Sequence, residues 1–203
     1  MIKKILISGA VISSLSLMLF CKHYIESKPT YVFNFEKTNI SNVREYDNCI
    51  AVEKALEKEI SFNPYNVNEI SNLNFTKMKK RLEETPMEGL SDYFVEAERL
   101  YGINSLFLAS LVANESSWST SDRAVYQNNL TGHAVYDRGS IGTVFNSKRE
   151  SILKTAEMLA RDYTNQYGIY HNGSAVWNIN TKYSEDKMWY KLIIQIGYEL
   201  LYR

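Results

Sequence analysis

The sequence predicts a mainly α-helical domain of the α+β class, with one small β-hairpin and an apolar N-terminal segment typical of a membrane helix. Three observations support this fold class. Apolar residues recur at helical spacing in several stretches separated by Gly and Pro. One stretch alternates about a turn rich in turn-forming residues. Residues 5–20 carry no charge, and the total of 203 residues suits one domain plus an appendage.

The composition argues against several classes of function. Lys+Arg and Asp+Glu balance at 23 each, so no net charge favours nucleic acid. The two cysteines, Cys21 and Cys49, form neither a disulfide framework nor a metal site, and the three histidines are scattered. No H-E-x-x-H, C-x-x-C or glycine-rich phosphate loop is present. We therefore expect no metal ion and no cofactor.

The N-terminus indicates export. Lys3 and Lys4 precede the uncharged run at 5–20, which is the order of a positive n-region and a hydrophobic h-region. Bulky side chains stand where a cleavage site needs small ones, so we predict an uncleaved signal anchor over residues 1–21 with the rest of the chain outside. A secreted protein released by signal cleavage is the alternative. Serines within the run permit contact with a membrane-protein partner but identify none.

The chain after the anchor divides into a stem and a domain. Residues 22–69 are polar and weakly patterned, except for a helical stretch at 49–60, and we predict an extracytoplasmic stem. The domain is expected over residues 70–203. Its first short helix, at 76–84, should stop before Pro86.

Two helices follow with clear end signals. Ser91 is a good N-cap for the first, and Gly102 is a good residue to end it. Asn104 then caps a second helix that is apolar nearly all round, so this helix should be buried on most faces. Glu115 falls at its C-terminal end.

The β-hairpin is predicted over residues 130–146, around an Arg-Gly turn region. After it, Ser147 and Glu150 form a capping-box pattern that opens another helix. Gly168 ends that helix, and the last helix is expected to begin after Ser184.

Glu115 has an unusual position for a charge. Leu111 and Val112 lie on the same face of its helix. Burial among them and the negative end of the helix dipole would both disfavour the ionised form. A carboxyl group that keeps its proton is what glycoside cleavage requires of a general acid. A glutamate that only accepts bonds from a neighbouring turn would show the same pattern.

The surrounding motifs favour the acid. V-A-N-E-S-S-W-S-T-S, Q-N-N-L-T-G and A-V-Y-D stand in order, between T-P-M-E-G-L-S-D-Y-F-V-E-A-E-R-L-Y-G-I-N upstream and F-N-S-K-R-E-S-I and I-N-T-K-Y-S-E-D-K-M-W downstream. Together they resemble the bacterial peptidoglycan endo-β-N-acetylglucosaminidases of glycoside hydrolase family 73, over roughly residues 70–203. The family's usual forms are A-L-E-S-G-W-G-x-S and K-N-N-L-F-G.

The resemblance implies a lysozyme-like fold whose hairpin forms the lip of a sugar cleft, in an enzyme that cuts the peptidoglycan glycan after N-acetylglucosamine. Glu115 matches the general acid, and Tyr183 matches a tyrosine placed against the reacting sugar. Tyr136 and Asp137 match the hairpin lip.

Further matches concern substrate binding. Asn128 and Asn129 match a pair that shapes the cleft floor, and Gly132 belongs to the same motif. Trp118 suits sugar stacking as well as packing under its loop, whereas Trp177 and Trp189 are expected in the core. Four residues depart from the usual family pattern: Ser117, Ser119, Thr131 and His133.

The second catalytic group has two candidates. Asp137 is the only acid between residues 130 and 146, and an inverting mechanism would use it as the base. Otherwise the 2-acetamido group of the substrate acts as internal nucleophile, oriented by Tyr183, and we favour this route. Glu150 is explained by its capping box.

Two other functions remain open. A lytic transglycosylase also uses one glutamate on a lysozyme-like fold, although its usual G-L-M-Q stretch is missing here. A peptidoglycan-binding module that has lost turnover is the alternative from another class, since serine and threonine replace the usual residues beside Glu115.

Overall fold

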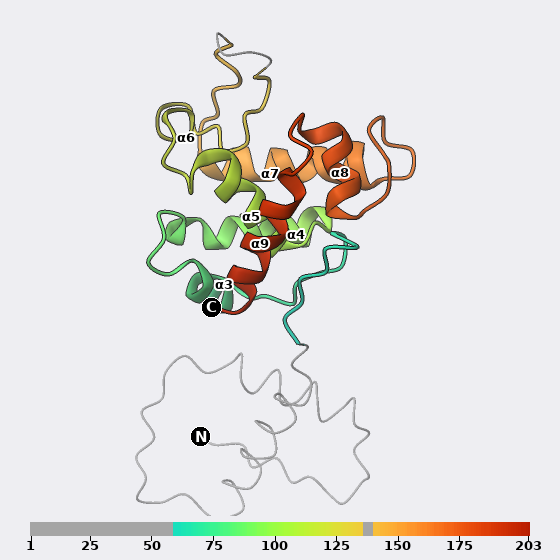
Figure 1. Cartoon of the computed structure of the whole chain (residues 1–203). Coiled ribbons are helices and arrows are strands. Elements are labelled where there is room, and N and C mark those ends of the chain that lie inside the picture. Colours follow the sequence, from blue (N-terminus) through green and yellow to red (C-terminus); the bar gives the residue numbers. More distant parts are fainter. Residues whose placement is uncertain (1–58, 136–139) are drawn as a thin grey trace, which may run out of the picture. The chain divides into compact units, whose positions relative to one another are not determined.

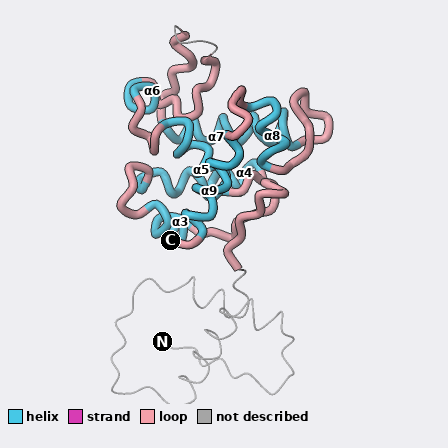
Figure 2. The backbone as a smooth tube through the Cα atoms, in the orientation of Figure 1, coloured by secondary structure: helices cyan, strands magenta, loops and turns pink. Residues whose placement is uncertain are grey.

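Helices make up all the regular structure in the part of the chain that the computed structural model describes, residues 59–135 and 140–203 (Figures 1 and 2). These residues belong to one compact unit, Glu59–Arg203. In chain order the elements are α3 (Phe75–Leu82), the 3₁₀ helix η2 (Glu88–Leu90), α4 (Ser91–Tyr101), α5 (Ser105–Ser116), α6 (Asp122–Tyr126), α7 (Lys148–Met158), the π-helix η3 (Leu159–Thr164), α8 (Val176–Tyr183) and α9 (Trp189–Leu201).

Helix α5 lies at the centre of this unit. All of its residues are buried except Asn114 and Glu115, as its all-round apolar sequence predicted. It packs mainly against α9 and also contacts α4 and α7, so the other helices surround it (Figure 1). The polar groups at its ends must therefore find partners within the protein.

The N-terminal end of α5 is fully capped. The Asn104 side chain accepts hydrogen bonds from the N–H groups of Leu106 and Phe107, at 3.0 and 3.1 Å. The Ser105 N–H donates to the carboxylate of Glu98 on α4, at 2.6 Å. The predicted cap at Asn104 is confirmed, and an anion at this end also suits the helix dipole.

The segment just before α3 packs with the helices. Asn104 Nδ2 donates to the carbonyl oxygens of Ser61 and Glu69, at 3.0 and 2.8 Å. Val67 is fully buried, and the ring of Phe62 lies against Gly197 of α9. Residues 59–69, which the sequence placed in the stem, are thus part of the compact unit.

Gly102 and Ser147 mark helix ends as the sequence predicts, whereas Ser91 does not. Gly102 ends α4 in the left-handed conformation at φ +68°, and the Ser147 side chain accepts from the Glu150 N–H at 3.1 Å. Ser91 is not the N-cap that the sequence predicts. The chain enters α4 from η2, so Ser91 is already helical and its hydroxyl donates to the Glu88 carbonyl instead.

The C-terminal helices differ from the prediction. Helix α8 falls in a stretch where no helix was expected. Helix α9 begins at Trp189 rather than directly after Ser184. The side chains of Ser184 and Asp186 accept hydrogen bonds from the N–H groups of Asp186 and Met188, so they form turns before the helix can start.

The predicted β-hairpin is not found, since residues 130–135 and 140–146 contain no strand. The Asn129 side chain forms hydrogen bonds with backbone groups that would pair with each other in a β-ladder. Its Nδ2 donates to the carbonyl oxygens of His133 and Thr143, both at 3.0 Å, and its Oδ1 accepts from the His133 N–H. Between the described parts of the two limbs, the Thr143 N–H still donates to the His133 carbonyl at 2.9 Å, and His133 Nδ1 lies 2.9 Å from the Thr143 hydroxyl.

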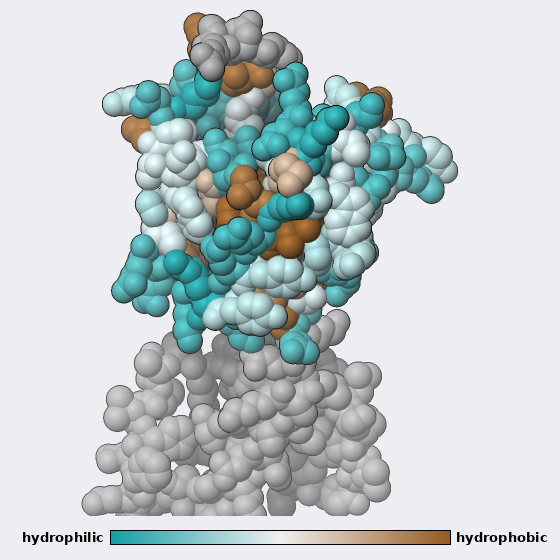
Figure 3. Space-filling model, viewed as in Figure 1, coloured by the Kyte–Doolittle hydropathy of each residue, from teal (hydrophilic) through white to brown (hydrophobic). Residues whose placement is uncertain are grey.

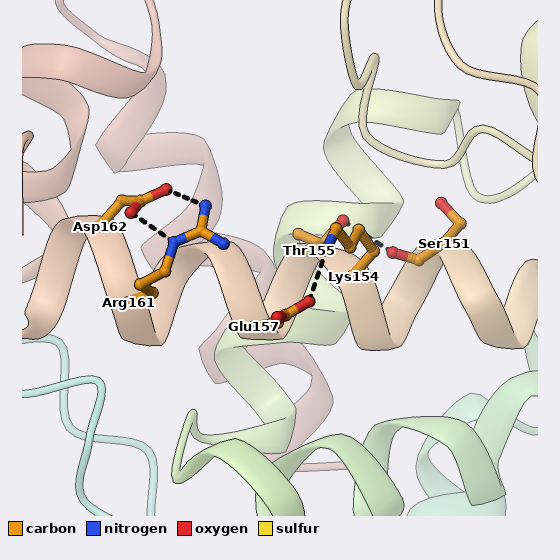
Figure 4. A network of polar contacts seen from close by, with 6 residues as sticks. All are labelled: Ser151, Lys154, Thr155, Glu157, Arg161 and Asp162. Carbon is orange, nitrogen blue, oxygen red and sulfur yellow. Dashed lines mark hydrogen bonds and ion pairs between the residues drawn. The ribbon is translucent and has the colours of Figure 1, made fainter.

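Helix α7 continues into the π-helix η3 with a polar outer surface (Figure 4). Lys154 pairs with Glu157 at 2.8 Å, and Arg161 pairs with Asp162 at 2.6 Å. The Lys154–Glu157 pair is open to solvent on both sides, so it adds little stability. The inner face carries the burial, and α7 packs chiefly on α4.

Helix α9 buries one face only. Trp189, Ile193, Gly197 and Leu200 face the core, while Met188 and Leu192 near its start are 51% and 47% exposed. Figure 3 shows apolar side chains gathered near the centre of this side of the molecule and ringed by hydrophilic ones.

Among the described residues no helix is both long and apolar enough to cross a bilayer, and the run at 5–20 lies outside them.

Gly168 should be required for the loop after η3. A Cβ here would lie 2.4 Å from the carbonyl oxygen of Asp162, a backbone atom that cannot move aside. We expect Gly168→Ala to lower the free energy of unfolding by about 1–3 kcal/mol in urea denaturation. Gly89→Ala is the control, because nothing lies within 4 Å of its Cβ position. Equal stability of the two variants would contradict this account.

Candidate active site

A cleft of about 760 Å³ lies beside the C-terminal end of α5. Glu115 lines it from α5, Tyr183 from the end of α8, and Tyr163 from the π-helix η3. The remaining lining residues come from α6, the loop after it and the end of α7: Ser121, Asp122, Arg123, Asn129, Thr131, Gly132, His133, Ala134, Val135 and Met158. Two of the residues predicted to be catalytic are therefore brought to one cleft.

Glu115 lies near the C-terminal end of α5, where the helix reaches solvent. The residue is exposed, so the expectation that it is buried among apolar side chains is wrong. Leu111 and Val112 are fully buried behind it, and the helix continues one residue further, to Ser116. Glu115 Oε1 accepts a hydrogen bond from Trp189 Nε1 at 2.6 Å and one from Asn114 Nδ2 at 3.2 Å.

The turn after Glu115 has an unusual backbone. Ser117, Trp118 and Ser119 all adopt positive φ angles, of 50°, 59° and 70°. The Ser116 hydroxyl supports the turn by donating to the Val112 carbonyl and accepting from the Ser119 N–H at 2.7 Å. Ser117 and Ser119 stand where the resembled family usually has glycine, and the left-handed conformation explains that preference.

Two side chains of this turn have a structural role. Ser119 Oγ lies 2.7 Å from Lys148 Nζ, which joins the turn to the start of α7. Trp118 packs partly against the hydrophobic core and is not among the residues that line the cleft. Of its two predicted roles, the described structure shows packing rather than a sugar-stacking position.

Tyr183 is held by contacts on three sides. Its ring lies 5.0 Å from that of Trp189 and 5.7 Å from that of Tyr163. Burial raises the pKa of Tyr183 well above its usual value, the charge of Glu115 adds to this, and a hydrogen bond with the Thr131 side chain acts in the other direction. The phenol therefore keeps its proton and can act as a hydrogen-bond donor in the cleft.

Thr131 replaces the family's usual aromatic residue and makes polar contacts instead. Besides its bond with Tyr183, its hydroxyl lies 2.8 Å from that of Thr155 on α7. The Thr155 hydroxyl in turn bonds the carbonyl of Ser151 (Figure 4). The substitution thus exchanges an apolar wall for a chain of hydroxyls.

The asparagine pair has two separate tasks. Asn129 is buried, lines the cleft and holds both limbs of the following loop. Asn128 adopts φ 52° and donates to the Phe145 carbonyl at 3.0 Å, but it is not among the lining residues. Gly132 lines the cleft at φ +66°. Tyr136 and Asp137 lie outside the described residues.

Sequence reasoning missed two aromatic residues of the site. Trp189 was expected only in the core. It is 3% exposed, as predicted, but it also contacts Glu115. Tyr163 lies in the stretch predicted as helix between Ser147 and Gly168, with no role in the site; it is 6% exposed in the core and also lines the cleft. Burial raises the pKa of Tyr163 to about 12, with smaller effects from Tyr170 and Asp162. The W in K-Y-S-E-D-K-M-W, close after Tyr183, was the available signal for Trp189.

Ser117→Gly should stabilise the protein. A Cβ in the left-handed region costs about 1–2 kcal/mol, and the extra freedom of glycine in the unfolded chain offsets part of the gain. We expect the free energy of unfolding to rise by about 0.5–1 kcal/mol in urea denaturation. Ser119→Gly is the matched comparison, because it relieves the same conformation but deletes the contact with Lys148. Destabilisation by Ser117→Gly would argue against strain at this turn.

Tyr163 should make stability fall at alkaline pH. Its folded pKa of about 12 exceeds the ordinary 10.0, so between these values the unfolded chain loses a proton that the folded protein keeps. Roughly 2 kcal/mol should be lost over this window, and Tyr163→Phe should remove that loss. Urea denaturation at pH 9 and pH 11.5 measures it. Tyr167→Phe, which removes a phenol that is 85% exposed, should keep the wild-type loss. A Tyr163→Phe protein with the same loss would refute this assignment.

Comparison with known proteins agrees with the geometry. Residues 91–201 match the Glucosaminidase family, described as mannosyl-glycoprotein endo-beta-N-acetylglucosaminidase. Two curated relatives from Streptococcus pneumoniae, each named "Putative endo-beta-N-acetylglucosaminidase", are 29% identical over 112 residues, or 54% of this chain. The chain spans only 17% and 16% of their lengths.

Two solved structures of Staphylococcus aureus autolysin E share the fold. One is a catalytic mutant in complex with the disaccharide NAG-NAM, with a TM-score of 0.54 and 15% identity over 76% of this chain and 77% of that one. The other is in complex with the muropeptide NAM-L-Ala-D-iGlu, with a TM-score of 0.55 and 16% identity over 84% and 81%. The mainly helical, lysozyme-like fold is thereby confirmed. Since the family match covers more than half of the chain, the protein belongs to the Glucosaminidase family.

Proposed function

We propose that the protein is a cell-wall hydrolase that cleaves the peptidoglycan glycan at the β-1,4 bond after N-acetylglucosamine, with Glu115 as general acid. One observation carries this proposal. Glu115 is an exposed carboxyl group on a cleft that also contains Tyr183, as the family resemblance requires. A glutamate sealed in the core would have refuted it.

The acid step needs a proton beside the scissile bond. Glu115 donates its proton to the glycosidic oxygen as the bond between this oxygen and the anomeric carbon breaks. The leaving sugar departs as an alcohol, and Glu115 becomes a carboxylate. Its place at the exposed C-terminal end of α5, on the lining of the cleft, supports this role.

The second step has two routes, and we favour substrate assistance. In this route the acetamido oxygen of the substrate bonds the anomeric carbon as the leaving oxygen departs. Water then attacks the same carbon, the bond to the acetamido oxygen breaks, and a proton of the water passes to the Glu115 carboxylate. Tyr183 supports it, because its raised pKa leaves a neutral phenol that can orient the acetamido group. The alternative is an inverting displacement in which Asp137 acts as base to a water molecule.

The substrate follows from the family and from the relatives. Autolysin E is bound to NAG-NAM in one of its structures and to a muropeptide in the other. We infer that the present cleft binds a similar substrate. It is lined by two tyrosines and by Asn129, and this mixture of aromatic and polar groups suits a sugar with amide substituents.

The N-terminal segment supports a location at the outer face of the cytoplasmic membrane. Residues 5–20 would anchor the chain, and Lys3 and Lys4 would stay inside. A tether would hold the enzyme within reach of the wall. Secretion after cleavage is the alternative, and the size of the protein in membrane and medium fractions separates the two.

Glu115→Gln tests the assignment. The variant keeps the side-chain shape but has no proton to donate, so the rate at which the full-length protein releases reducing ends from peptidoglycan should fall about 10²–10⁴-fold. Glu185→Gln is the control, since Glu185 is exposed and does not line the cleft. Unchanged activity of Glu115→Gln would rule out Glu115 as the acid.

Mass spectrometry of the products identifies the reaction. Reducing N-acetylglucosamine ends are the expected result. Anhydro-muramic ends would show a lytic transglycosylase instead. Tight binding to cell wall with no product would show a binding module.

A further inference from the structure

Trp189 donates a short hydrogen bond to the Glu115 carboxylate. Its indole Nε1 lies 2.6 Å from Glu115 Oε1, although the two residues are 74 positions apart in the chain. Trp189 is the first residue of α9 and is 3% exposed. A buried donor has thus been brought to the edge of the cleft, where it meets the proposed proton donor.

The chemistry of indole decides which oxygen can hold the proton. An indole N–H can only donate a hydrogen bond, so Glu115 Oε1 must accept from it. Asn114 Nδ2 points to the same oxygen, at 3.2 Å. The carbonyl oxygen of a protonated carboxyl group is a better acceptor than its hydroxyl oxygen, so the short bond from Trp189 favours Oε1 as the carbonyl oxygen. The proton of Glu115 then resides on Oε2.

We propose that Trp189 is a positioning residue, whose indole N–H fixes Glu115 Oε1 as the acceptor and leaves Oε2 as the oxygen that delivers the proton into the cleft. This inference rests on the proposed role of Glu115 as general acid. The carboxyl group of a free glutamate can rotate and exchange its two oxygens. Here the exchange would break a short hydrogen bond to a donor that cannot follow the rotation.

The surroundings of Trp189 keep the indole in place. Its ring packs on one side against Tyr183, at 5.0 Å and 32°. Helix α9, which carries Trp189, packs along α5, which carries Glu115. One rigid pair of helices therefore sets the distance between donor and acceptor, and α8 adds Tyr183 to the same group. The acid and the neutral phenol are positioned through a shared neighbour.

The hydrogen bond has a consequence for pH dependence. An N–H group bonds a carboxylate more strongly than a neutral acid, so Trp189 stabilises the ionised form of Glu115. Loss of the N–H favours the protonated form. The activity of an enzyme with one general acid falls as pH rises and the acid ionises. Without the indole N–H, this alkaline fall should move to higher pH.

Trp189→Phe in the full-length protein tests the proposal by kinetics. The variant keeps an aromatic ring beside Tyr183 but lacks the N–H. We expect kcat to fall about 10–100-fold with little change in KM, and the alkaline limb of the rate to move to higher pH. Trp177→Phe is the matched control, since Trp177 lies on α8 against Tyr65, away from the cleft lining. An unmoved alkaline limb in Trp189→Phe would overturn the proposal.

A second measurement needs neither activity nor a folded Trp189 variant. The chain has three tryptophans, so its NMR spectrum should show three indole N–H signals, assigned through Trp118→Phe and Trp177→Phe. The Trp189 signal should titrate with Glu115 in the wild-type protein and stop titrating in Glu115→Gln. A Trp189 signal that ignores the Glu115→Gln change would refute the hydrogen bond. A protein that shows this titration but cleaves no glycan would instead refute the proposed function.

Discussion

The burial of α5 on every side is the constraint on which the rest of the structure depends. A helix with no face in water must find partners inside the protein for the polar groups at both of its ends. At the N-terminal end Asn104 and Glu98 supply them, and Asn104 also ties residues 61–69 to the helix. At the C-terminal end α5 reaches solvent, and Glu115 is exposed there. The position of Glu115 thus follows from the packing of the core.

The exit from α5 has serine at two positions, Ser117 and Ser119, where the family usually has glycine. Three successive residues after Ser116 adopt left-handed conformations, which glycine accepts at the lowest cost. The chain uses serine nevertheless. Ser119 recovers part of the cost through its contact with Lys148, and the Ser116 hydroxyl bonds backbone on both sides of the turn. The turn is therefore held by side-chain hydrogen bonds, which keep Glu115 at the cleft edge although its backbone is strained.

The sequence predicted features that depend on neighbouring residues. Asn104, Gly102 and Ser147 mark helix ends through local hydrogen bonds and backbone preferences, and each was correctly placed. The contact between Trp189 and Glu115 could not be predicted in this way, because it joins residues 74 positions apart. Local sequence signals gave wrong predictions where a side chain takes the hydrogen bonds that the backbone of a hairpin or helix would otherwise make. Asn129 satisfies the groups that would have paired in a hairpin, and Asp186 forms a turn where a helix was expected to begin.

The principal groups of the cleft are linked through Tyr183. The charge of Glu115 raises the pKa of Tyr183, and burial does so more strongly, so Tyr183 remains a neutral donor beside the carboxyl group. Trp189 packs against Tyr183 and donates a hydrogen bond to Glu115. Thr131, in the loop after α6, forms a hydrogen bond with the Tyr183 hydroxyl. Each of these donors comes from a separate part of the chain. The geometry of the site therefore depends on the folded core as a whole. The short motifs supply the side chains, and the packing of the core sets the distances between them.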